Sequence, residues 1–362
     1  MIYLDNAATT KIDPRVYAKM EPWLKEKFGN PSAQYSLGRE AKAAIELARE
    51  EIAEVIGCLP EEIIFTSGGT EANNIALLGI REKKFIASSR IEHPSVWNIL
   101  GHYPSRDFVP VKENGIVANT LRARHDRDYD IVTLMAVNNE TGVKQPFEDF
   151  AEWCSWTGIP FHLDAVQAFG KIKLDLKNVD TMSVSAHKFN GPKGIGFLYK
   201  NLATDRAQLM YGGHQEDGFR PGTENVAAIV GMAEAVKIHS DPKPLNLGWF
   251  EDMLVEIGAV INGISCHEDK WKRIINCRFS DIHNGTLMRA LDEMGIFIGT
   301  GSACNSSLAV PSRVLKAMGL TDEQCNQSIR LSPDESFTKE QAKEVIEAIQ
   351  KIRRESHFVD SI

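Results

Sequence analysis

Signals for export or membrane insertion are missing from the 362-residue sequence. Its first residues do not combine a basic segment with an apolar one, and no apolar run approaches the roughly 18 residues that span a bilayer. The chain also has no excess of positive charge, since it contains 41 basic and 49 acidic residues and has a formal net charge of −8. We therefore expect a cytoplasmic protein with no membrane partner. The charge also argues against general electrostatic binding of nucleic acid.

Cysteine and histidine are present, but they lack the spacing of metal sites and disulfide frameworks. No Cys-x-x-Cys pair occurs, and the histidines show no pairing at metal-ligand spacing. We expect no metal site and, in a chain of this size, reduced thiols. The six cysteines are Cys58, Cys154, Cys266, Cys277, Cys304 and Cys325. The hydrophobic content of 43% suits a globular protein with a substantial core.

Short apolar runs alternate with helical patterns in the first two thirds of the chain. This alternation predicts an α/β fold, with a mainly parallel central sheet flanked by helices on both faces. The expected helices cover residues 70–78, 93–100 and 147–157. The expected strands cover residues 62–66, 84–87, 130–137, 160–164, 181–185 and 194–199.

The pattern changes after residue 240, where the run DPKP (241–244) is a plausible domain boundary. A long helix, strands near 274–275 and 329–331, and a final helix over 338–354 predict a smaller α+β domain. We therefore expect a large domain over residues 16–242. The small domain would join residues 1–15 to residues 243–362 and carry Cys304.

Lys188 is the most informative residue, and it follows an expected strand in the run SAHKFNGPKG (185–194). A lysine at the end of a buried strand is a candidate for a Schiff base, because burial lowers its pKa and leaves a nucleophilic amine. The neighbouring Ser185 and His187 can donate hydrogen bonds to a phosphate. A lysine that reacts with aldehydes, beside phosphate donors, suggests pyridoxal phosphate (PLP) as cofactor.

A second phosphate-binding motif is the run TSGGTEANN (66–74). Gly68 and Gly69 permit a tight strand-to-helix turn, and the backbone N–H groups at such a helix start attract an anion. Thr70 adds a hydroxyl donor. The alternative is an ordinary turn in which Thr70 is the helix N-cap.

Polar residues follow several other expected strands, where open α/β sheets bind their ligands. Asp164 can pair with the protonated pyridine nitrogen of PLP, or cap a helix with Gln167 three residues later. His93 can stack on the ring and move protons, although a lone loop histidine is more often structural. Asn139 can offer an amide to the ring hydroxyl, or simply form a turn.

Three candidate residues lie outside these strand ends. Cys304 lies in the run GTGSACNSS (299–307), whose small polar residues favour an accessible nucleophile over an inert buried thiol. Arg330 lies on an expected strand that is otherwise apolar. Its two alternative roles are a bidentate clamp on a substrate carboxylate and a structural ion pair. Thr223 ends a glycine-rich polar segment and can cap the following helix, donate to a phosphate, or both.

Together these motifs resemble those of the group I cysteine desulfurases, the NifS/IscS type, within the class V aminotransferases and the fold-type I PLP enzymes. The resemblance covers essentially the whole chain, from YLDNAATT (3–10) and GNPS (29–32) to GSAC (301–304). It implies a PLP enzyme that converts L-cysteine to L-alanine. Lys188 would bind PLP and move protons, and Cys304 would become a persulfide for transfer to an acceptor. It also implies a homodimer in which Thr223 reaches the phosphate of the partner subunit.

The resemblance assigns further roles residue by residue. His93 stacks on the ring and acts with Lys188 and Cys304 in catalysis. Asp164 pairs with the pyridine nitrogen, and Asn139 and Gln167 bond the ring hydroxyl. Asn139 and Arg330 hold the substrate carboxylate. The expected phosphate ligands are Gly69, Thr70, Ser185 and His187.

The sequence departs from this family at Tyr35, often a histidine, at Asp217, commonly an arginine, and at residues 333–336, where PDES replaces a Leu-Gly-Arg-type run. These differences spare the cofactor residues. The expected acceptor stays open among iron–sulfur scaffolds, tRNA-thiolation proteins and DNA sulfur-modification proteins. Two alternatives for the whole chain are a PLP-dependent aminotransferase or β-lyase, which needs no loop cysteine, and an inactive sulfur-pathway scaffold.

Overall fold

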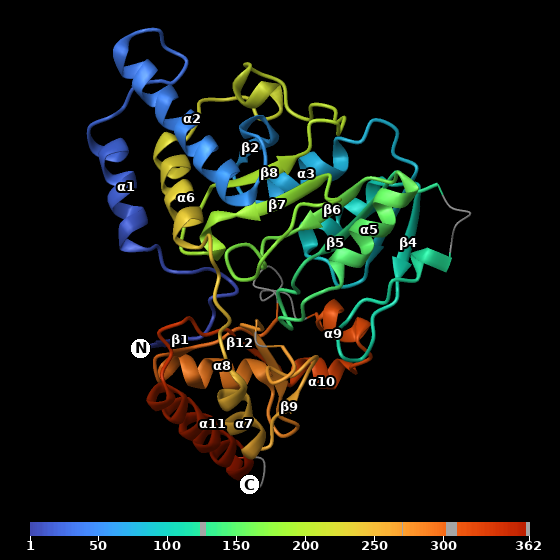
Figure 1. Ribbon diagram of the computed structural model, residues 1–362. Helices are drawn as coiled ribbons and strands as arrows, with labels where there is room; N and C mark the ends of the chain where they lie inside the picture. The colour runs from blue at the N-terminus through green and yellow to red at the C-terminus, as the bar shows by residue number, and fades with distance from the viewer. Residues whose placement is uncertain (124–127, 270, 302–309, 360–362) are drawn as a thin grey trace.

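The computed structural model describes residues 1–123, 128–269, 271–301 and 310–359. A seven-stranded sheet with helices on both faces forms its larger part (Figure 1). β8 runs antiparallel to both of its neighbours, and the other neighbouring strands are parallel. The expected α/β architecture is therefore confirmed. In spatial order the strands are β2 (Ile63–Thr66), β8 (Gly196–Lys200), β7 (Thr181–Ser185), β6 (Phe161–Asp164), β5 (Ile131–Met135), β3 (Phe85–Ser89) and β4 (Ser105–Val109).

Both faces of the sheet are buried, because successive side chains of a strand point to opposite faces. In β2, Ile63 and Phe65 join one hydrophobic cluster, while Ile64 joins another. The first cluster is covered by α2 (Ser36–Ile56), α5 (Phe147–Thr157) and α6 (Val226–Ile238), with α1 (Pro14–Lys25) packed against α6. The second is covered by α3 (Gly69–Leu78) and α4 (Pro94–Trp97). This two-sided burial explains why the strands read as nearly continuous apolar runs.

The remaining part combines short strands with helices, as the sequence predicts. β12 (Ser328–Leu331), β10 (Ile275–Arg278) and β9 (Val260–Ile261) form an antiparallel sheet, and β1 (Ile2–Tyr3) pairs with β11 (Ile296–Phe297). The helix expected after residue 244 is short rather than long, because α7 (Gly248–Glu256) is followed by Gly258 with φ 89°. The other helices are α8 (Asn284–Glu293), α9 (Arg313–Ala317), α10 (Asp322–Asn326) and α11 (Lys339–Val359).

A separate hydrophobic cluster joins these C-terminal elements to Ile2 and Leu4 at the start of the chain. Figure 1 shows the N-terminal strand beside the C-terminal elements. Val314 and Leu315 of α9 instead pack with the cluster of the large sheet. The domain boundaries given above stay a prediction.

Strand register places the site. Parallel pairing sets Met135 of β5 beside Asp164 of β6, and Asp164 beside Ser183 of β7. The segments that leave these strands therefore emerge at one edge of the sheet, which is where α/β proteins bind ligands. Lys188 lies at the end of a short 3₁₀ turn, Ala186–Lys188, directly after β7.

Candidate active site

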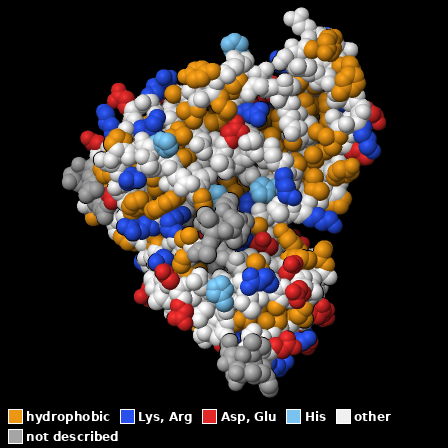
Figure 2. Space-filling view, turned by 180° about the vertical axis from the view of Figure 1, so that it is seen from behind, with side chains coloured by type: hydrophobic (Ala, Val, Ile, Leu, Met, Phe, Trp, Pro, Cys, Tyr) orange, Lys and Arg blue, Asp and Glu red, His pale blue; other side chains and the backbone are white. Residues whose placement is uncertain are grey.

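A cavity of about 220 Å³ lies at this edge of the sheet. Arg330 and all the predicted cofactor residues except Thr223 line it, so the fold brings together residues from six separate segments. Figure 2 shows histidine side chains where the back of the molecule is indented between its two parts. The predicted residues that line the cavity are Gly69, Thr70, His93, Asn139, Asp164, Gln167, Ser185, His187, Lys188 and Arg330.

The first turn of α3 forms one end of the cavity. Its N-cap is Gly68, with φ 148°, so the alternative of Thr70 as N-cap is wrong. A Cβ added at Gly69 would lie 2.4 Å from Val166 Cγ2, so only glycine allows this close approach of α3 to the segment after β6. Backbone N–H groups at a helix start, with the Thr70 hydroxyl, suit an anion such as phosphate.

Ser185, the last residue of β7, and His187, in the turn after it, also line the cavity. Ser185 is buried, and His187 Nδ1 lies 3.1 Å from Thr9 Oγ1. Burial lowers the pKa of His187 to about 4, and the nearby Lys188 adds to the effect. His187 is therefore a neutral hydrogen-bonding group at neutral pH.

Lys188 is held by the N-terminal segment. Its Nζ donates hydrogen bonds to the carbonyl oxygens of Ala7 (2.7 Å) and Ala8 (2.8 Å). The same Ala7 oxygen accepts a hydrogen bond from Gln167 Nε2 at 2.8 Å, and Lys171 Nζ donates to Gln167 Oε1 at 3.1 Å. Nothing in the sequence marks Ala7 or Ala8, because backbone carbonyls carry no residue-specific signal, and the side chain of Lys171 was also not predicted here.

Asp164 and His93 lie on the wall formed by β6 and the segment after β3. Asp164 is buried, and its Oδ1 accepts a hydrogen bond from Val166 N at 3.1 Å. The segment that follows is a turn and not a helix, so the alternative of Asp164 as a helix cap is wrong. His93 is the N-cap of α4, and its Nδ1 accepts a hydrogen bond from Ser95 N at 3.1 Å. Burial lowers the pKa of His93, so its ring is neutral at physiological pH.

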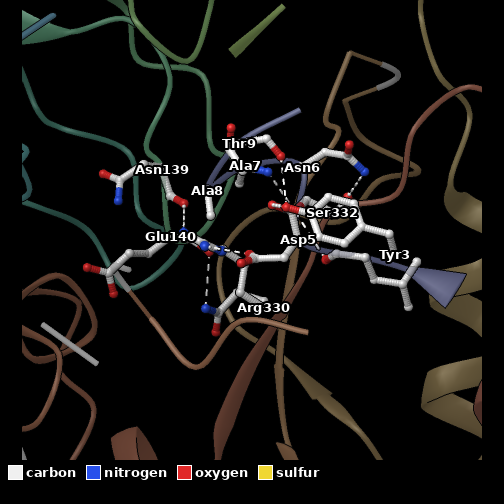
Figure 3. A network of polar contacts seen from close by, with 12 residues as sticks. Tyr3, Asp5, Asn6, Ala7, Ala8, Thr9, Asn139, Glu140, Arg330 and Ser332 are labelled. Carbon is white, nitrogen blue, oxygen red and sulfur yellow. Dashed lines mark hydrogen bonds and ion pairs between the residues drawn. The ribbon is translucent and has the colours of Figure 1, made fainter. Parts of the chain in front are cut away.

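Arg330 forms a structural ion pair, which was one of the two alternatives for it, and it also lines the cavity. Its side chain is 2% exposed, its Nη2 lies 2.7 Å from Asp5 Oδ1, and its Nη1 donates to the carbonyl oxygen of Asn139 at 2.8 Å (Figure 3). Its Nε has no hydrogen-bond partner among the described residues. The guanidinium is thus fixed by Asp5 and Asn139 against the cavity wall.

One predicted residue that the structure describes, Thr223, does not line the cavity. Thr223 is exposed, and α6 is capped by Asn225, which accepts a hydrogen bond from Ala228 N, so the capping alternative for Thr223 is wrong. Cys304 lies outside the described residues.

Among the departures from the family, Tyr35 is 59% exposed and Asp217 is exposed. Residues 333–336 line a second cavity of about 470 Å³, which also touches Lys188.

The donors and acceptors of the 220 Å³ cavity fit PLP. An amine, a buried carboxylate and a cluster of phosphate donors match its aldehyde, pyridine nitrogen and phosphate. The close approach of α3 at Gly69 leaves backbone N–H groups facing the phosphate end. These residues come from α3, the segment after β3, β6 and the segment after β7, as expected for a site built at strand ends.

The fold and site define a class. The family model of the class V aminotransferases matches residues 2–345, and the chain belongs to this family. More particularly, the chain is 38% identical over 371 residues to the cysteine desulfurase IscS of Dictyoglomus turgidum, covering 97% of this chain and 94% of the relative.

Two solved structures share the fold. A NifS-like protein superposes with a TM-score of 0.86 at 32% identity, covering 99% of both chains. A structure described as SspA in complex with cysteine superposes with a TM-score of 0.80 at 33% identity, covering 92% of this chain and 99% of the other. The predicted resemblance to NifS/IscS-type proteins, and with it the fold class, is confirmed.

Proposed function

We propose that this protein is a PLP-dependent cysteine desulfurase, which converts L-cysteine to L-alanine and passes the sulfur to an acceptor. The observation that carries the proposal is the single cavity in which Lys188, Asp164, His93 and Arg330 meet the phosphate-binding start of α3. The relative from Dictyoglomus turgidum named a cysteine desulfurase supports the same reaction.

The residues of the cavity have complementary tasks in this reaction. Bound PLP supplies an electron sink that weakens the bond between Cβ and the sulfur of the substrate. Arg330 is placed to bind the substrate carboxylate, because it lines the cavity and its Nε has no partner among the described residues. Lys188 Nζ moves protons, and the Ala7 and Ala8 carbonyl oxygens accept its hydrogen bonds and so position it.

The resemblance to the family assigns Cys304 the role of accepting the sulfur. The Cys304 thiolate attacks the substrate sulfur, so an S–S bond forms while the Cβ–S bond breaks. The substrate Cβ gains one proton, and the products are L-alanine and a persulfide on Cys304. L-Cysteine and the thiol together hold the same atoms as these two products, and no external oxidant is needed.

The surface supports self-association into a homodimer. Large hydrophobic side chains are exposed on α1, α2 and the segment between them, and Figure 2 shows hydrophobic side chains gathered on that side of the molecule. Monomeric proteins rarely expose large apolar patches. Thr223 is exposed and does not line its own cavity, which suits the proposed contact with a partner subunit. The exposed residues are Tyr17, Leu24, Phe28, Tyr35, Leu37 and Leu47.

We also propose a compartment and a class of sulfur acceptor. Among the described residues no helix is long and apolar enough to cross a membrane, and the cysteines there are free. These features suit the reducing cytoplasm. The sulfur acceptor is proposed to be an iron–sulfur scaffold, a tRNA-thiolation protein or a DNA sulfur-modification protein, and identifying the protein that receives sulfur from Cys304 decides among them.

The reaction is tested by incubating the purified, PLP-loaded protein with L-cysteine and measuring alanine, pyruvate and protein-bound persulfide. We expect alanine, with Lys188→Ala losing the Schiff-base absorbance and all turnover. Cys304→Ala should keep the absorbance but form no persulfide, while Cys58→Ala, a half-buried cysteine outside the cavity, should behave as wild type. Pyruvate as the main product would indicate a β-lyase, and a protein without Schiff-base absorbance would indicate an inactive scaffold.

A further inference from the structure

Asn73 is a fully buried asparagine in the middle of α3. Asparagine is a poor residue for a helix interior, since its amide competes with the backbone for hydrogen bonds. Here the amide makes no local bond. It contacts His162 of β6, Asp164 at the end of the same strand, and Ser95 of α4. Asn73 is thus a buried polar side chain that links three elements beside the cavity, and helix formation does not explain its presence there.

The orientation of the Asn73 amide follows from the chemistry of its neighbours. Asn73 Nδ2 lies 3.0 Å from Asp164 Oδ2, and an ionised carboxylate only accepts hydrogen bonds, so the NH₂ group must face Asp164. The Asn73 oxygen then faces His162 Nε2 at 2.9 Å, and this nitrogen must carry a hydrogen. Burial lowers the pKa of His162 to about 3, so the ring is neutral. Its Nδ1 therefore accepts a hydrogen bond from Thr181 Oγ1 at 2.9 Å.

The second N–H of Asn73 reaches the other wall of the cavity. It donates to Ser95 Oγ at 2.8 Å, and Ser95 Oγ lies 2.8 Å from His93 Nδ1. Since the Ser95 backbone N–H also donates to His93 Nδ1, that nitrogen is an acceptor and the ring hydrogen lies on Nε2. One amide therefore links Asp164 to His93, the two residues proposed to contact the ring of PLP.

We propose that Asn73, held in one orientation by His162, is a positioning residue that sets Asp164 and His93 for the cofactor ring. This inference rests on the proposed function, because it assumes that PLP binds in the cavity. Asn73 donates a hydrogen bond to the Asp164 carboxylate, which fixes its plane and leaves its remaining acceptor sites for the pyridine N–H. Neither Asn73 nor His162 lines the cavity, so both act through the residues that do.

The proposal predicts an effect on the electronic state of the cofactor as well as on its binding. A firmly protonated pyridine nitrogen withdraws electrons and lowers the pKa of the imine between PLP and lysine. If Asp164 loses its orientation, the pyridine proton is held less firmly and the imine pKa rises. A residue that merely stabilised the fold would not move this value.

The test measures PLP affinity and the pH midpoint of the imine absorbance for the full-length protein. For Asn73→Ala we expect the PLP dissociation constant to rise about tenfold, the size of one hydrogen bond to a charged group. The imine midpoint should rise by about one pH unit. His162→Gln keeps an N–H donor toward Asn73 and should stay near wild type, whereas His162→Leu should shift both quantities in the direction of Asn73→Ala.

A buried asparagine elsewhere provides the control. Asn284 donates to the carbonyl oxygens of Cys325 (3.3 Å) and Ser328 (2.9 Å), away from the cavity, so Asn284→Ala should lower stability without moving the midpoint. Wild-type values for both quantities in Asn73→Ala would overturn the proposal. If Asn73→Ala does not fold, equal behaviour of His162→Gln and His162→Leu would overturn it instead. Absence of the imine band in the wild-type protein would refute the proposed function rather than this network.

Discussion

At the scale of single residues, Glu92 is a buried acid that the proposed reaction does not use. It is completely buried next to His93, its Oε1 accepts a hydrogen bond from Ser89 Oγ, and its Oε2 has no partner among the described residues. Burial, with the negative charge of Asp164, raises the pKa of Glu92 from 4.5 to about 8. The carboxyl group is therefore protonated in the folded protein at neutral pH and ionised in the unfolded chain.

Glu92→Gln should stabilise the protein at pH 8 and have little effect near pH 4.5. Between these values the folded state binds one proton more than the unfolded state, so wild-type stability is lost as pH rises toward 8. We expect the variant to gain at least about 1 kcal/mol in unfolding free energy at pH 8, measured by denaturant titration. The exposed Glu148, paired with Lys144, is the control, and Glu148→Gln should change little at either pH. A Glu92→Gln difference that does not grow with pH would contradict the expectation.

Some residues of the site could be predicted from the sequence, and others could not. Lys188, Asp164 and Gly69 were predicted because their residue types stand at or just after the ends of expected strands, where local pattern and chemistry agree. Asn73 stands in the same motif, yet its partners His162 and Ser95 lie 89 and 22 positions away. A buried asparagine in a helix interior is itself a usable signal, since it needs distant partners.

At the scale of elements, the start of α3 decides how closely backbone approaches the cofactor site. Gly68 has a φ of 148°, and Gly69 packs against Val166 with no room for a Cβ. The sequence predicts this turn from its two glycines. The need for glycine at position 69, however, comes from a side chain on another segment.

Gly69→Ala should weaken PLP binding about tenfold or more, because the new methyl group would displace the first turn of α3 from the phosphate donors. Absorbance titration with PLP measures the effect. The double variant Gly69→Ala, Val166→Ala lacks the clashing Cγ2 and should bind PLP almost as tightly as Val166→Ala alone. Gly101→Ala, at a site with no atom within 4 Å of the added Cβ, should bind PLP as wild type does. Failure of the double variant to recover would show that the clash is not the cause.

Elements differed in how readily the sequence predicted them. β7 and α5 were predicted over their observed bounds, because an apolar run and an amphipathic pattern are unambiguous there. β4 was missed, since its sequence SRDFV has an exposed start and looks like a loop. α2 was also left out, although its buried residues Ala41, Ile45, Ala48 and Ile52 follow helical spacing.

At the scale of the whole molecule, the N-terminal segment connects the two parts of the structure. Leu4 is completely buried in the C-terminal cluster, and a few residues later Ala7 and Ala8 present their carbonyl oxygens to Lys188. Asp5, between them, pairs with Arg330 (Figure 3). The packing of the C-terminal cluster therefore positions groups in the active site.

Leu4→Ala should lower both the stability and the PLP affinity of the protein. Removing a buried leucine side chain costs about 2–5 kcal/mol, and loosening its segment frees the carbonyl groups that position Lys188. Leu254→Ala removes an equally buried side chain of the same cluster that has no link to the cavity. We expect Leu254→Ala to lose about as much unfolding free energy as Leu4→Ala, measured by denaturant titration, but to keep the wild-type PLP affinity. Equal PLP affinity in the two variants would contradict the proposed coupling.

The sequence by itself determined the α/β class, the main strands, and the chemistry gathered at their ends, because side-chain periodicity and residue type are local properties of the chain. Only the tertiary structure decided which groups hold those residues in place. The acceptors for Lys188 are backbone carbonyls 181 and 180 positions away, and every residue has such a carbonyl. Nothing in the local pattern marks Ala7 and Ala8, since their role arises from the way the N-terminal segment packs against the C-terminal cluster.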